Sequence, residues 1–210
     1  ARRQRQMCIR DSNNGDTYYA NRFFSNNKKK EYFDADGNNM QKAFLRAPLD
    51  FAYISSHFNP NRMHPILHTI RAHNGVDYAA KRGSPVRTTG DGNISFVGRK
   101  NGCGNEIVIK HSNEYTTRYC HLERFEKNIK KGKKVSQGDT IGFVGSTGLA
   151  TGPHLHYEFK VGNKHTNPIK VKLPSAEPVA DNLKSSFDTL FMKNKLMLEE
   201  FNKLFSYENG

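Results

Sequence analysis

The chain of 210 residues carries 33 Lys and Arg against 20 Asp and Glu, which gives a net charge of +13. Such an excess favours polyanionic partners, among them nucleic acids, anionic membrane surfaces and the acidic polymers of cell walls. Hydrophobic residues make up only 35% of the chain, and no stretch approaches the roughly 18 consecutive apolar residues of a membrane-spanning helix. The composition therefore predicts a domain with a very polar surface and no transmembrane span.

The N-terminal part of the chain is polar and begins with "ARRQRQMCIRDS", which lacks the apolar stretch of a signal peptide. We therefore expect a processed or truncated product whose targeting segment is absent. Two aromatic runs, "TYYANRFF" and "KKEYFD", are typical of short strands. We interpret residues 1–42 as an N-terminal β segment, consistent with the remainder of a preceding domain.

From about Ala43 the pattern changes to short apolar or alternating runs separated by glycine-containing turns. The runs are "SPVRTTGDGNISFVGR", "NEIVIKH", "YTTRYCHL", "DTIGFVG" and "HLHYEFKV". Closely spaced short strands with almost no helical periodicity between them predict an antiparallel β-sandwich or barrel-like domain. We expect a mainly β fold, with this domain at residues 43–178.

The last part of the chain changes to a period of 3.6 residues. Leu183, Phe187 and Phe191 fall on one stripe, and Asp181 is a suitable N-cap. Residues 179–210 are therefore predicted to form a C-terminal amphipathic α-helix. We expect this helix to pack on its own domain rather than to bind a membrane.

The three cysteines show neither the even count nor the close spacing of a disulfide framework or a zinc cluster. They are Cys8, Cys103 and Cys120. If the strands around the turn at 112–114 pair regularly, Cys120 lies opposite Glu106, and Cys103 lies opposite Glu123. A disulfide bridge between Cys103 and Cys120 is therefore not expected. The cysteines do not indicate whether the protein works in an oxidising or a reducing compartment.

The positive charge peaks in residues 99–134, which include the run "KNIKKGKK". No aromatic residue is interleaved with these lysines to stack a nucleic-acid base, and no nucleic-acid-binding motif is present. We interpret the run as a solvated loop and expect no nucleic-acid partner.

The stretch "RAHNGVDYAAK" places His73 and Asp77 four residues apart. Gly75 and Val76 disfavour a helix here, and on a straight strand the two side chains would lie about 13 Å apart. A shared metal ion therefore requires a bend, which the pair Asn74-Gly75 permits. Taken alone, the stretch is better explained as a turn and a strand with both side chains solvated.

The stretch "GPHLHYEF" places His154 and His156 on one face of a strand, about 6–7 Å apart. Taken alone, the pair is explained equally well as two unrelated surface histidines and as part of a metal site. One histidine of this pair together with His73 and Asp77 can supply the three ligands of a catalytic zinc, which lowers the pKa of its bound water towards ~7. No HExxH glutamate is present, so we expect a neutral histidine as base. The candidates are His121 and the unused member of the pair.

The chain from about Ala43 to Pro178 resembles the lysostaphin/LytM-type zinc metallopeptidases of bacterial cell walls. The resemblance rests on an HxxxD, an HL and an HxH motif, in "HNGVD", "YCHL" and "GPHLH". The stretch "AFLRAPLDFAYISSHFNPNRMHPIL" is most similar to the sequences of the Gram-negative members, which act as murein DD-endopeptidases.

The resemblance implies a role for each site residue. The zinc ligands would be His73, Asp77 and His156, while His154 and His121 would flank the open side, activate water and stabilise the oxyanion. The sequence departs from the family at Cys120, where glycine commonly precedes the catalytic histidine. We interpret Cys120 as a small buried thiol and a mild change.

The remaining histidines are interpreted as structural or surface residues. They are His57, His64, His68, His111 and His165.

The expected function is that of a zinc-dependent endopeptidase that cuts peptide cross-links of peptidoglycan, with D-alanyl–diaminopimelate bonds favoured by the resemblance. Its partners would be peptidoglycan peptide stems, and its location the periplasm or cell envelope of a Gram-negative bacterium. The alternative is a non-catalytic wall-binding module that activates another peptidoglycan hydrolase. The intact set of five site residues argues against this alternative.

Overall fold

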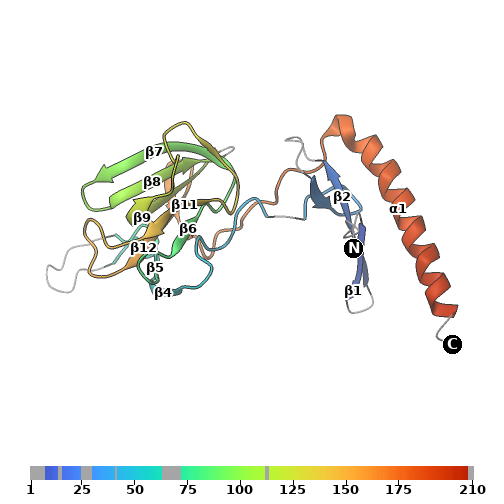
Figure 1. Ribbon diagram of the computed structural model, residues 1–210, viewed down its shortest axis with the longest axis horizontal. Helices are drawn as coiled ribbons and strands as arrows, with labels where there is room; N and C mark the ends of the chain where they lie inside the picture. The colour runs from blue at the N-terminus through green and yellow to red at the C-terminus, as the bar shows by residue number, and fades with distance from the viewer. Residues whose placement is uncertain are drawn as a thin grey trace. The chain divides into compact units, whose positions relative to one another are not determined.

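The computed structural model describes residues 8–13, 16–24, 30–40, 42–62, 72–111 and 114–207. The fold is mainly antiparallel β with one C-terminal helix, as predicted (Figure 1). Contacts divide the chain into two units, Phe44–Lys172 on the one hand and Ala1–Ala43 with Leu173–Gly210 on the other. Among the residues expected to be structural or at the surface, His64 and His68 lie outside the described residues.

The larger unit is built on one antiparallel sheet in the order β10-β7-β8-β9-β12-β5-β4, with β11 joined to β9, β6 joined to β11 and β13 joined to β12. Its strands are β4 (Tyr53–Ser56), β5 (Val76–Ala79), β6 (Pro85–Arg87), β7 (Gly92–Lys100), β8 (Gly104–Lys110), β9 (Tyr115–Phe125), β10 (Lys134–Val135), β11 (Thr140–Val144), β12 (His154–Val161) and β13 (Lys164–Thr166).

Strand β12 shows the alternation that shapes this unit. Leu155, Tyr157 and Phe159 are at most 1% exposed and belong to the core. Because side chains alternate along a strand, the residues between them, His154 and His156 included, point to the opposite face. One face of the sheet is therefore apolar and buried, and the other presents polar side chains for chemistry.

His111 has the structural role expected from the sequence. It is buried, its Nδ1 donates to the Asp91 carbonyl over 2.7 Å, and its Nε2 lies 2.7 Å from Thr117 Oγ1. The ring of Phe44 packs edge-on against it. Burial lowers the pKa of the His111 imidazole below its ordinary value, so the ring is neutral at pH 7.

The prediction about the cysteines is wrong, because Cys103 and Cys120 form a disulfide with Cα atoms 4.9 Å apart. The β8–β9 ladder has the expected register between Ile107 and Tyr119, but an irregularity before it shifts Asn105 to a position opposite Leu122. Cys103 lies outside the ladder, since β8 begins only at residue 104. The regular hairpin does not reach this cysteine, and Cys120 is half of a bridge rather than a free thiol.

The smaller unit combines both ends of the described chain. It contains β1 (Cys8–Asn13), β2 (Asp16–Phe24), β3 (Lys30–Phe33) and α1 (Asp181–Tyr207). The first of these strands was not predicted. Phe33 from the sheet and Phe187 from the helix share a buried cluster with Val179 and Phe191. The predicted helix therefore packs on the N-terminal sheet through its apolar stripe.

Two backbone contacts join the segments that lead into and out of the larger unit. Lys42 pairs with Ser175 in an isolated antiparallel bridge, and the Ala43 N–H donates to the Pro174 carbonyl over 3.1 Å. The two segments therefore run side by side at this point.

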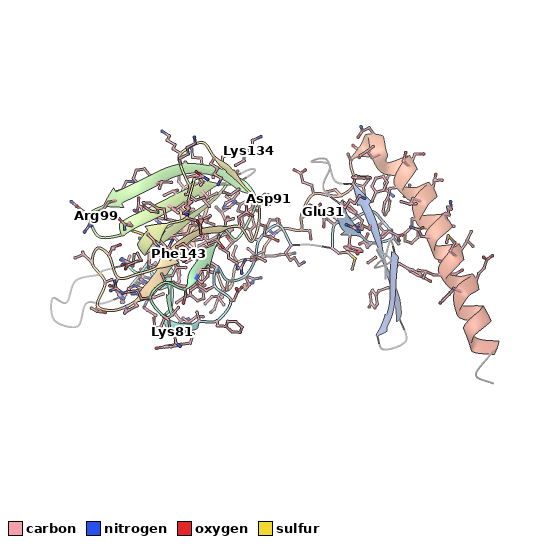
Figure 2. The ribbon with its side chains drawn as sticks, viewed as in Figure 1. Glu31, Lys81, Asp91, Arg99, Lys134 and Phe143 are labelled. Atoms are coloured by element: carbon pink, nitrogen blue, oxygen red, sulfur yellow. A yellow bond between two sulfur atoms is a disulfide. The ribbon has the colours of Figure 1, made fainter. Side chains whose placement is uncertain are left out.

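Charged side chains are found on the outside of the larger unit. Lys81, Arg99 and Lys134 are exposed and project from its strands and loops (Figure 2). Within the described part of the chain, no helix has the length and apolar character needed to cross a membrane.

Candidate metal centre and active site

The sheet brings the predicted ligands together across β5 and β12. His156 lies opposite Asp77 in the antiparallel register, and His154 lies opposite Ala79. His73 precedes β5 and is held by backbone hydrogen bonds to Asn59. The chain bends between His73 and Asp77, as the sequence predicts for a shared ion.

The bend depends on the close approach of the backbone at Gly75 to β12. A Cβ atom on Gly75 would lie 2.5 Å from the Tyr157 carbonyl oxygen and 2.8 Å from the His156 ring. No side chain fits in that space, so glycine is required for packing rather than for an unusual φ. This contact places His73 beside the ligands on the sheet.

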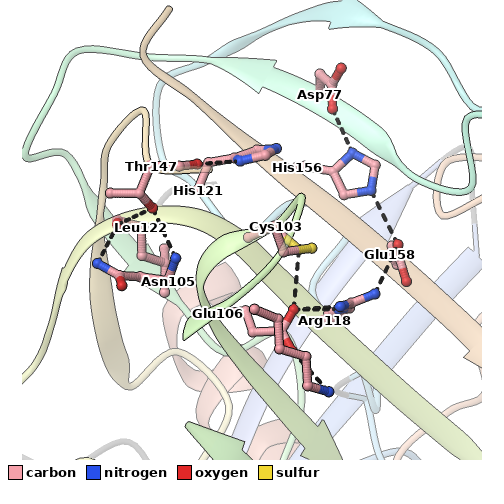
Figure 3. The surroundings of a disulfide bond; sticks show 12 residues. Asp77, Cys103, Asn105, Glu106, Arg118, His121, Leu122, Thr147, His156 and Glu158 are labelled. Carbon is pink, nitrogen blue, oxygen red and sulfur yellow. Dashed lines mark hydrogen bonds and ion pairs between the residues drawn. A yellow bond between two sulfur atoms is a disulfide. The ribbon is translucent and has the colours of Figure 1, made fainter. Parts of the chain in front are cut away.

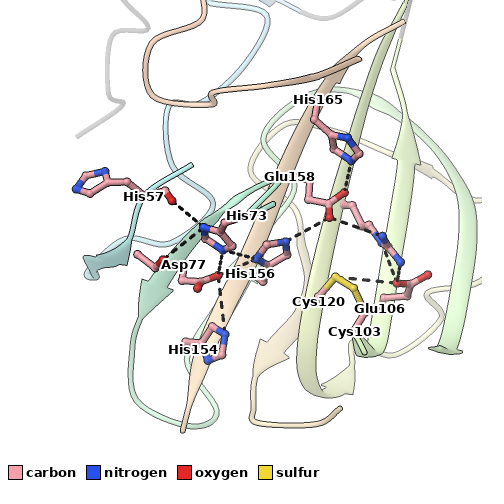
Figure 4. A network of polar contacts seen from close by, with 12 residues as sticks. His57, His73, Asp77, Cys103, Glu106, Cys120, His154, His156, Glu158 and His165 are labelled. Atoms are coloured by element: carbon pink, nitrogen blue, oxygen red, sulfur yellow. Dashed lines mark hydrogen bonds and ion pairs between the residues drawn. A yellow bond between two sulfur atoms is a disulfide. The ribbon is translucent and has the colours of Figure 1, made fainter. Parts of the chain in front are cut away.

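Three donor atoms converge to form the candidate metal centre (Figure 4). His73 Nε2 lies 3.1 Å from Asp77 Oδ1 and 3.2 Å from His156 Nδ1. The third side, from His156 Nδ1 to Asp77 Oδ1, measures 2.7 Å. Ligands of a tetrahedral zinc stand about 3.3 Å apart, given metal–ligand bonds of about 2.0–2.1 Å. The triangle therefore fits a zinc-sized ion after a small expansion.

The outer nitrogen of each ligand histidine is held by a partner that fixes its tautomer. His73 Nδ1 donates to the His57 carbonyl oxygen over 2.7 Å. His156 Nε2 lies 3.2 Å from a carboxylate oxygen of Glu158 and donates to it. With these N–H groups committed, the lone pairs of His73 Nε2 and His156 Nδ1 are directed at the centre.

The charges at the centre are strongly coupled. Burial alone would raise the pKa of the Asp77 carboxyl, but hydrogen bonds from His156 and His73 hold this pKa well below its usual range. Burial opposes protonation of His156, yet Asp77 and Glu158 together raise its pKa to about 9. A cation is therefore favoured between these groups, and without a metal a proton on His156 takes that role.

His154 and His121 stand beside this triangle. His154 Nε2 lies 3.9 Å from Asp77 Oδ1, while its Nδ1 donates to the Gly152 carbonyl over 2.9 Å. The His121 ring centroid lies 4.7 Å from that of His154, and His121 Nδ1 donates to the Thr147 carbonyl over 2.7 Å. Burial lowers the pKa of His121, so its neutral form presents a free lone pair on Nε2.

A backbone irregularity directs His121 to this face. Along β9, Thr117 and Tyr119 are core residues, and a regular strand would send His121 to the core as well. Instead His121 has a φ of 61°, and Leu122 takes the next core position with 0% exposure. The irregularity works as a β-bulge that re-aims one side chain.

An open hollow of about 570 Å³ lies next to His154 on the same face of the sheet. Tyr53 lies opposite Ala79, and Ala79 lies opposite His154. Because paired residues share a face, these three side chains form a row across β4, β5 and β12. The hollow is lined by Phe51, Ala52, Tyr53, Ala79, Ala80, Lys81 and Pro153.

Glu158 and Thr147 contribute to the site but were not predicted from the sequence. Glu158 had a readable signal, because it follows His154 and His156 at the same spacing of two residues and shares their face. Thr147 acts through its backbone carbonyl, which leaves no trace in the residue type. His165, expected to be a structural or surface residue, lies 3.0 Å from Glu158 through its Nε2.

Comparisons with known proteins agree with this geometry. Residues 71–168 match the model of peptidase family M23. The chain is 45% identical over 173 residues to peptidoglycan DD-endopeptidase ShyC of Vibrio cholerae, covering 82% of this chain and 40% of that protein. It is 50% identical over 146 residues to DD-carboxypeptidase/endopeptidase Mpg of Neisseria meningitidis, covering 69% of this chain and 33% of that protein. The chain thus spans less than half the length of these relatives.

Solved structures share the fold. A zinc-containing peptidase from Vibrio cholerae has a TM-score of 0.62 at 38% identity, covering 80% of this chain and 50% of that chain. The catalytic domain of lysostaphin from Staphylococcus simulans has a TM-score of 0.50 at 31% identity, covering 56% and 90%. The antiparallel sheet and the candidate centre of His73, Asp77 and His156 agree with a metallopeptidase. The chain belongs to peptidase family M23, which confirms the resemblance seen in the sequence.

Proposed function

We propose that the chain acts as a zinc-dependent endopeptidase that hydrolyses peptide cross-links of peptidoglycan. The observation that carries the proposal is the triangle of His73 Nε2, Asp77 Oδ1 and His156 Nδ1, with sides of 3.1, 3.2 and 2.7 Å. His121 and His154 complete it with two imidazoles outside the ligand set.

Zinc suits the donor set of two imidazole nitrogens and one carboxylate oxygen, which leaves a fourth position open. When bound, the ion supplies Lewis acidity, which polarises a scissile carbonyl and acidifies water. His73, Asp77 and His156 would hold it. Their partners at His57 and Glu158 keep both imidazoles in the ligating tautomer.

The two remaining histidines handle the proton and the developing charge. Their Nδ1–H groups are held by the carbonyls of Gly152 and Thr147, so Nε2 is the nitrogen of each ring that can accept a proton. As water attacks the carbonyl carbon, one imidazole takes its proton. The protonated ring then donates to the oxyanion and passes the proton to the amide nitrogen as the C–N bond breaks. The second proton of the water follows to the same nitrogen, so the products are a carboxylate and an ammonium group.

The substrate assignment rests on the names of the relatives, several of which are peptidoglycan DD-endopeptidases. These names support a DD-endopeptidase, and the resemblance seen in the sequence favours the D-alanyl–diaminopimelate cross-link as the bond cut by this chain. The open hollow beside His154 gives room for an extended peptide, and the charge of +13 favours adsorption to an anionic wall or outer-membrane surface.

The disulfide supports a location in the periplasm or cell envelope of a Gram-negative bacterium. Disulfides persist in oxidising compartments and are rare in the cytosol. The bridge between Cys103 and Cys120 is therefore compatible with the periplasm, and the curated relatives come from Gram-negative genera.

The test is digestion of cross-linked muropeptides by the purified protein, with products identified by mass spectrometry. We expect about one zinc per chain, cleavage that stops with a chelator, and recovery when zinc is restored. His154→Ala should lower kcat by about 10²–10⁴-fold, the range for loss of a general acid–base group, while zinc content is kept.

Lys130→Ala replaces an exposed side chain in the run "KNIKKGKK". This variant is the control and should cleave normally. Full activity of His154→Ala, or of the metal-free protein, would contradict the proposed mechanism. A protein that binds the wall and shows no turnover alone, yet stimulates a second hydrolase, would support the activator alternative instead.

A further inference from the structure

His121 has a backbone conformation that the surrounding chain must enforce. Its φ of 61° lies in the left-handed region, which is unfavourable for residues that carry a Cβ. Its N–H donates to the Cys103 carbonyl over 2.8 Å, and its Nδ1 donates to the Thr147 carbonyl over 2.7 Å. Two separate loops therefore hold the backbone and the ring of this residue.

The two loops interlock around His121. A Cβ atom on Gly104 would lie 2.4 Å from the Thr147 carbonyl carbon, so the first residue of β8 is in close contact with the loop after β11. The Leu149 N–H donates to the Gly102 carbonyl over 2.8 Å. Thr147 Oγ1 donates to the Leu122 carbonyl and accepts from the Asn105 N–H, each over 2.9 Å.

The disulfide closes this arrangement covalently (Figure 3). Cys120 immediately precedes His121, and Cys103 supplies the carbonyl that receives the His121 N–H. Cys120 is also paired with His156 across β9 and β12, and it is fully buried. The bridge therefore ties the turn that holds His121 to the row of the sheet that carries a predicted metal ligand.

We propose that the Cys103–Cys120 disulfide is a positioning element for His121, and that its reduction lowers turnover without releasing the metal. The inference rests on the proposed function, in which His121 acts in hydrolysis. On reduction by a phosphine, the S–S bond breaks, each sulfur gains an electron and a proton, and the phosphine becomes its oxide with oxygen from water. The turn is then held only by hydrogen bonds, so His121 samples other backbone conformations.

The bridge is linked to the candidate metal centre through the backbone pairing of Cys120 with His156, and this ladder pairing does not need the S–S bond. The ligands of the centre are positioned by the pairing of β5 with β12, by the close approach at Gly75 and by the partners of the two ligand histidines. None of these contacts involves either cysteine. Loss of the bridge should therefore separate metal binding from catalysis.

The experiment compares the wild type before and after reduction by a phosphine with the double variant Cys103→Ser/Cys120→Ser. Since misplacement of a catalytic group by about 1 Å costs about 10²-fold, we expect kcat to fall by roughly ten- to a hundredfold in both cases. KM should stay within about twofold, and one zinc per chain should remain. The serine variant should be indifferent to the phosphine.

Ile109→Ala controls for stability alone, because Ile109 is a fully buried residue of β8 outside the turn. All assays are run well below the melting temperature of each variant. The control should lose melting temperature while keeping kcat. Unchanged kcat in the double variant, loss of zinc from it, or an equal fall of kcat in Ile109→Ala would overturn the proposal.

A second readout does not require activity. In the oxidised protein, the hydrogen bond from His121 Nδ1 to Thr147 should give a slowly exchanging ring N–H signal by NMR, and reduction should broaden or remove it. An unchanged signal would contradict the positioning role. If the oxidised wild type fails to cleave muropeptides while this signal responds to reduction, the proposed function fails and the positioning of His121 stands.

Discussion

Glu158 connects the candidate metal centre to a series of charged side chains on the same face of the sheet. It lies 3.2 Å from His156 Nε2 and 3.0 Å from His165 Nε2. Arg118 lies 3.7 Å from Glu158 and also contacts the fully buried Glu106. Burial alone would raise the pKa of Glu158, but His156 and Arg118 lower it to about 2. Glu158 is therefore ionised and suited to hold the His156 ring.

Glu158→Gln should weaken zinc binding by about ten- to a hundredfold, the usual effect of losing an outer partner of a ligand histidine. The neutral amide keeps the size of the side chain but not the charge that sets the orientation of His156. Titration against a competing chelator at pH 7.5 measures this effect. Glu114→Gln, at an exposed position, is the control, and equal affinities of the two variants would contradict the role.

His111→Gln should make the stability of the fold less dependent on pH. The folded state lowers the pKa of His111 through burial, so below the ordinary pKa of about 6.5 the unfolded chain binds more protons. The free energy of unfolding therefore falls as the pH drops through this window. Urea unfolding at pH 7.5 and 5.5, with chelator in every sample, should show a smaller fall for His111→Gln. If the free energy of unfolding falls equally in the wild type and in His111→Gln, His111 is not the group responsible for the pH dependence.

At the scale of elements, the longer strands of the larger unit and the helix were predictable because their patterns are regular, whereas β1, β4, β10 and β13 were not predicted. In β12, alternation placed His154 and His156 on one face, as the structure shows. Asn74-Gly75 indicated the bend that brings His73 to the sheet, although close packing on β12 is the physical cause.

The irregularity in β9 was not predictable from alternation. A regular hairpin places Cys103 opposite Glu123, whereas the structure shifts Leu122 to a position opposite Asn105. The shift depends on a left-handed backbone at His121 and on tight contacts with a loop distant in sequence. Such contacts have no periodic signal. Cys103 between two glycines was the only local sign of an unusual turn.

Gly104→Ala should destabilise the chain beside His121 by more than the strain of its positive φ alone would cost. Gly104 has a φ of +65°, and an added Cβ would meet the Thr147 backbone at 2.4 Å. Gly83→Ala is the matched control, because Gly83 has a φ of +83° but no described atom within 4 Å of its Cβ position. We expect about 1–2 kcal/mol lost in the control and clearly more in Gly104→Ala, together with a lower kcat. Equal losses by chemical denaturation would contradict the role of the contact.

At the scale of the whole molecule, the predicted division into residues 1–42, 43–178 and 179–210 stays a prediction. In the structure, Phe33 and Phe187 from the two end segments share one cluster, and the Asn194 amide donates to Asn21 Oδ1 over 3.0 Å. These contacts span more than half of the chain. The sequence pattern cannot predict these contacts. The pattern of each end segment indicates an apolar face but not the segment against which that face packs.

Phe187→Ala should destabilise the smaller unit and leave the metal centre intact. Phe187 is fully buried in the cluster of that unit, and truncation of a buried phenylalanine costs about 3–5 kcal/mol. Hydrogen exchange should rise in the helix and in β2 and β3, while zinc affinity stays unchanged. Met192→Ala, on the exposed side of the helix, is the control. A parallel loss of zinc affinity in Phe187→Ala would show that the two units are coupled.

The contacts between Lys42 and Ser175, and between Ala43 and Pro174, have a consequence for engineering. A unit whose incoming and outgoing segments lie side by side is suited to domain insertion. A surface loop of a host protein can accept it, because the two points of attachment are adjacent. The larger unit could be transplanted into another scaffold at such a loop. Its own ends could equally be joined by a short peptide, with new termini opened elsewhere on its surface.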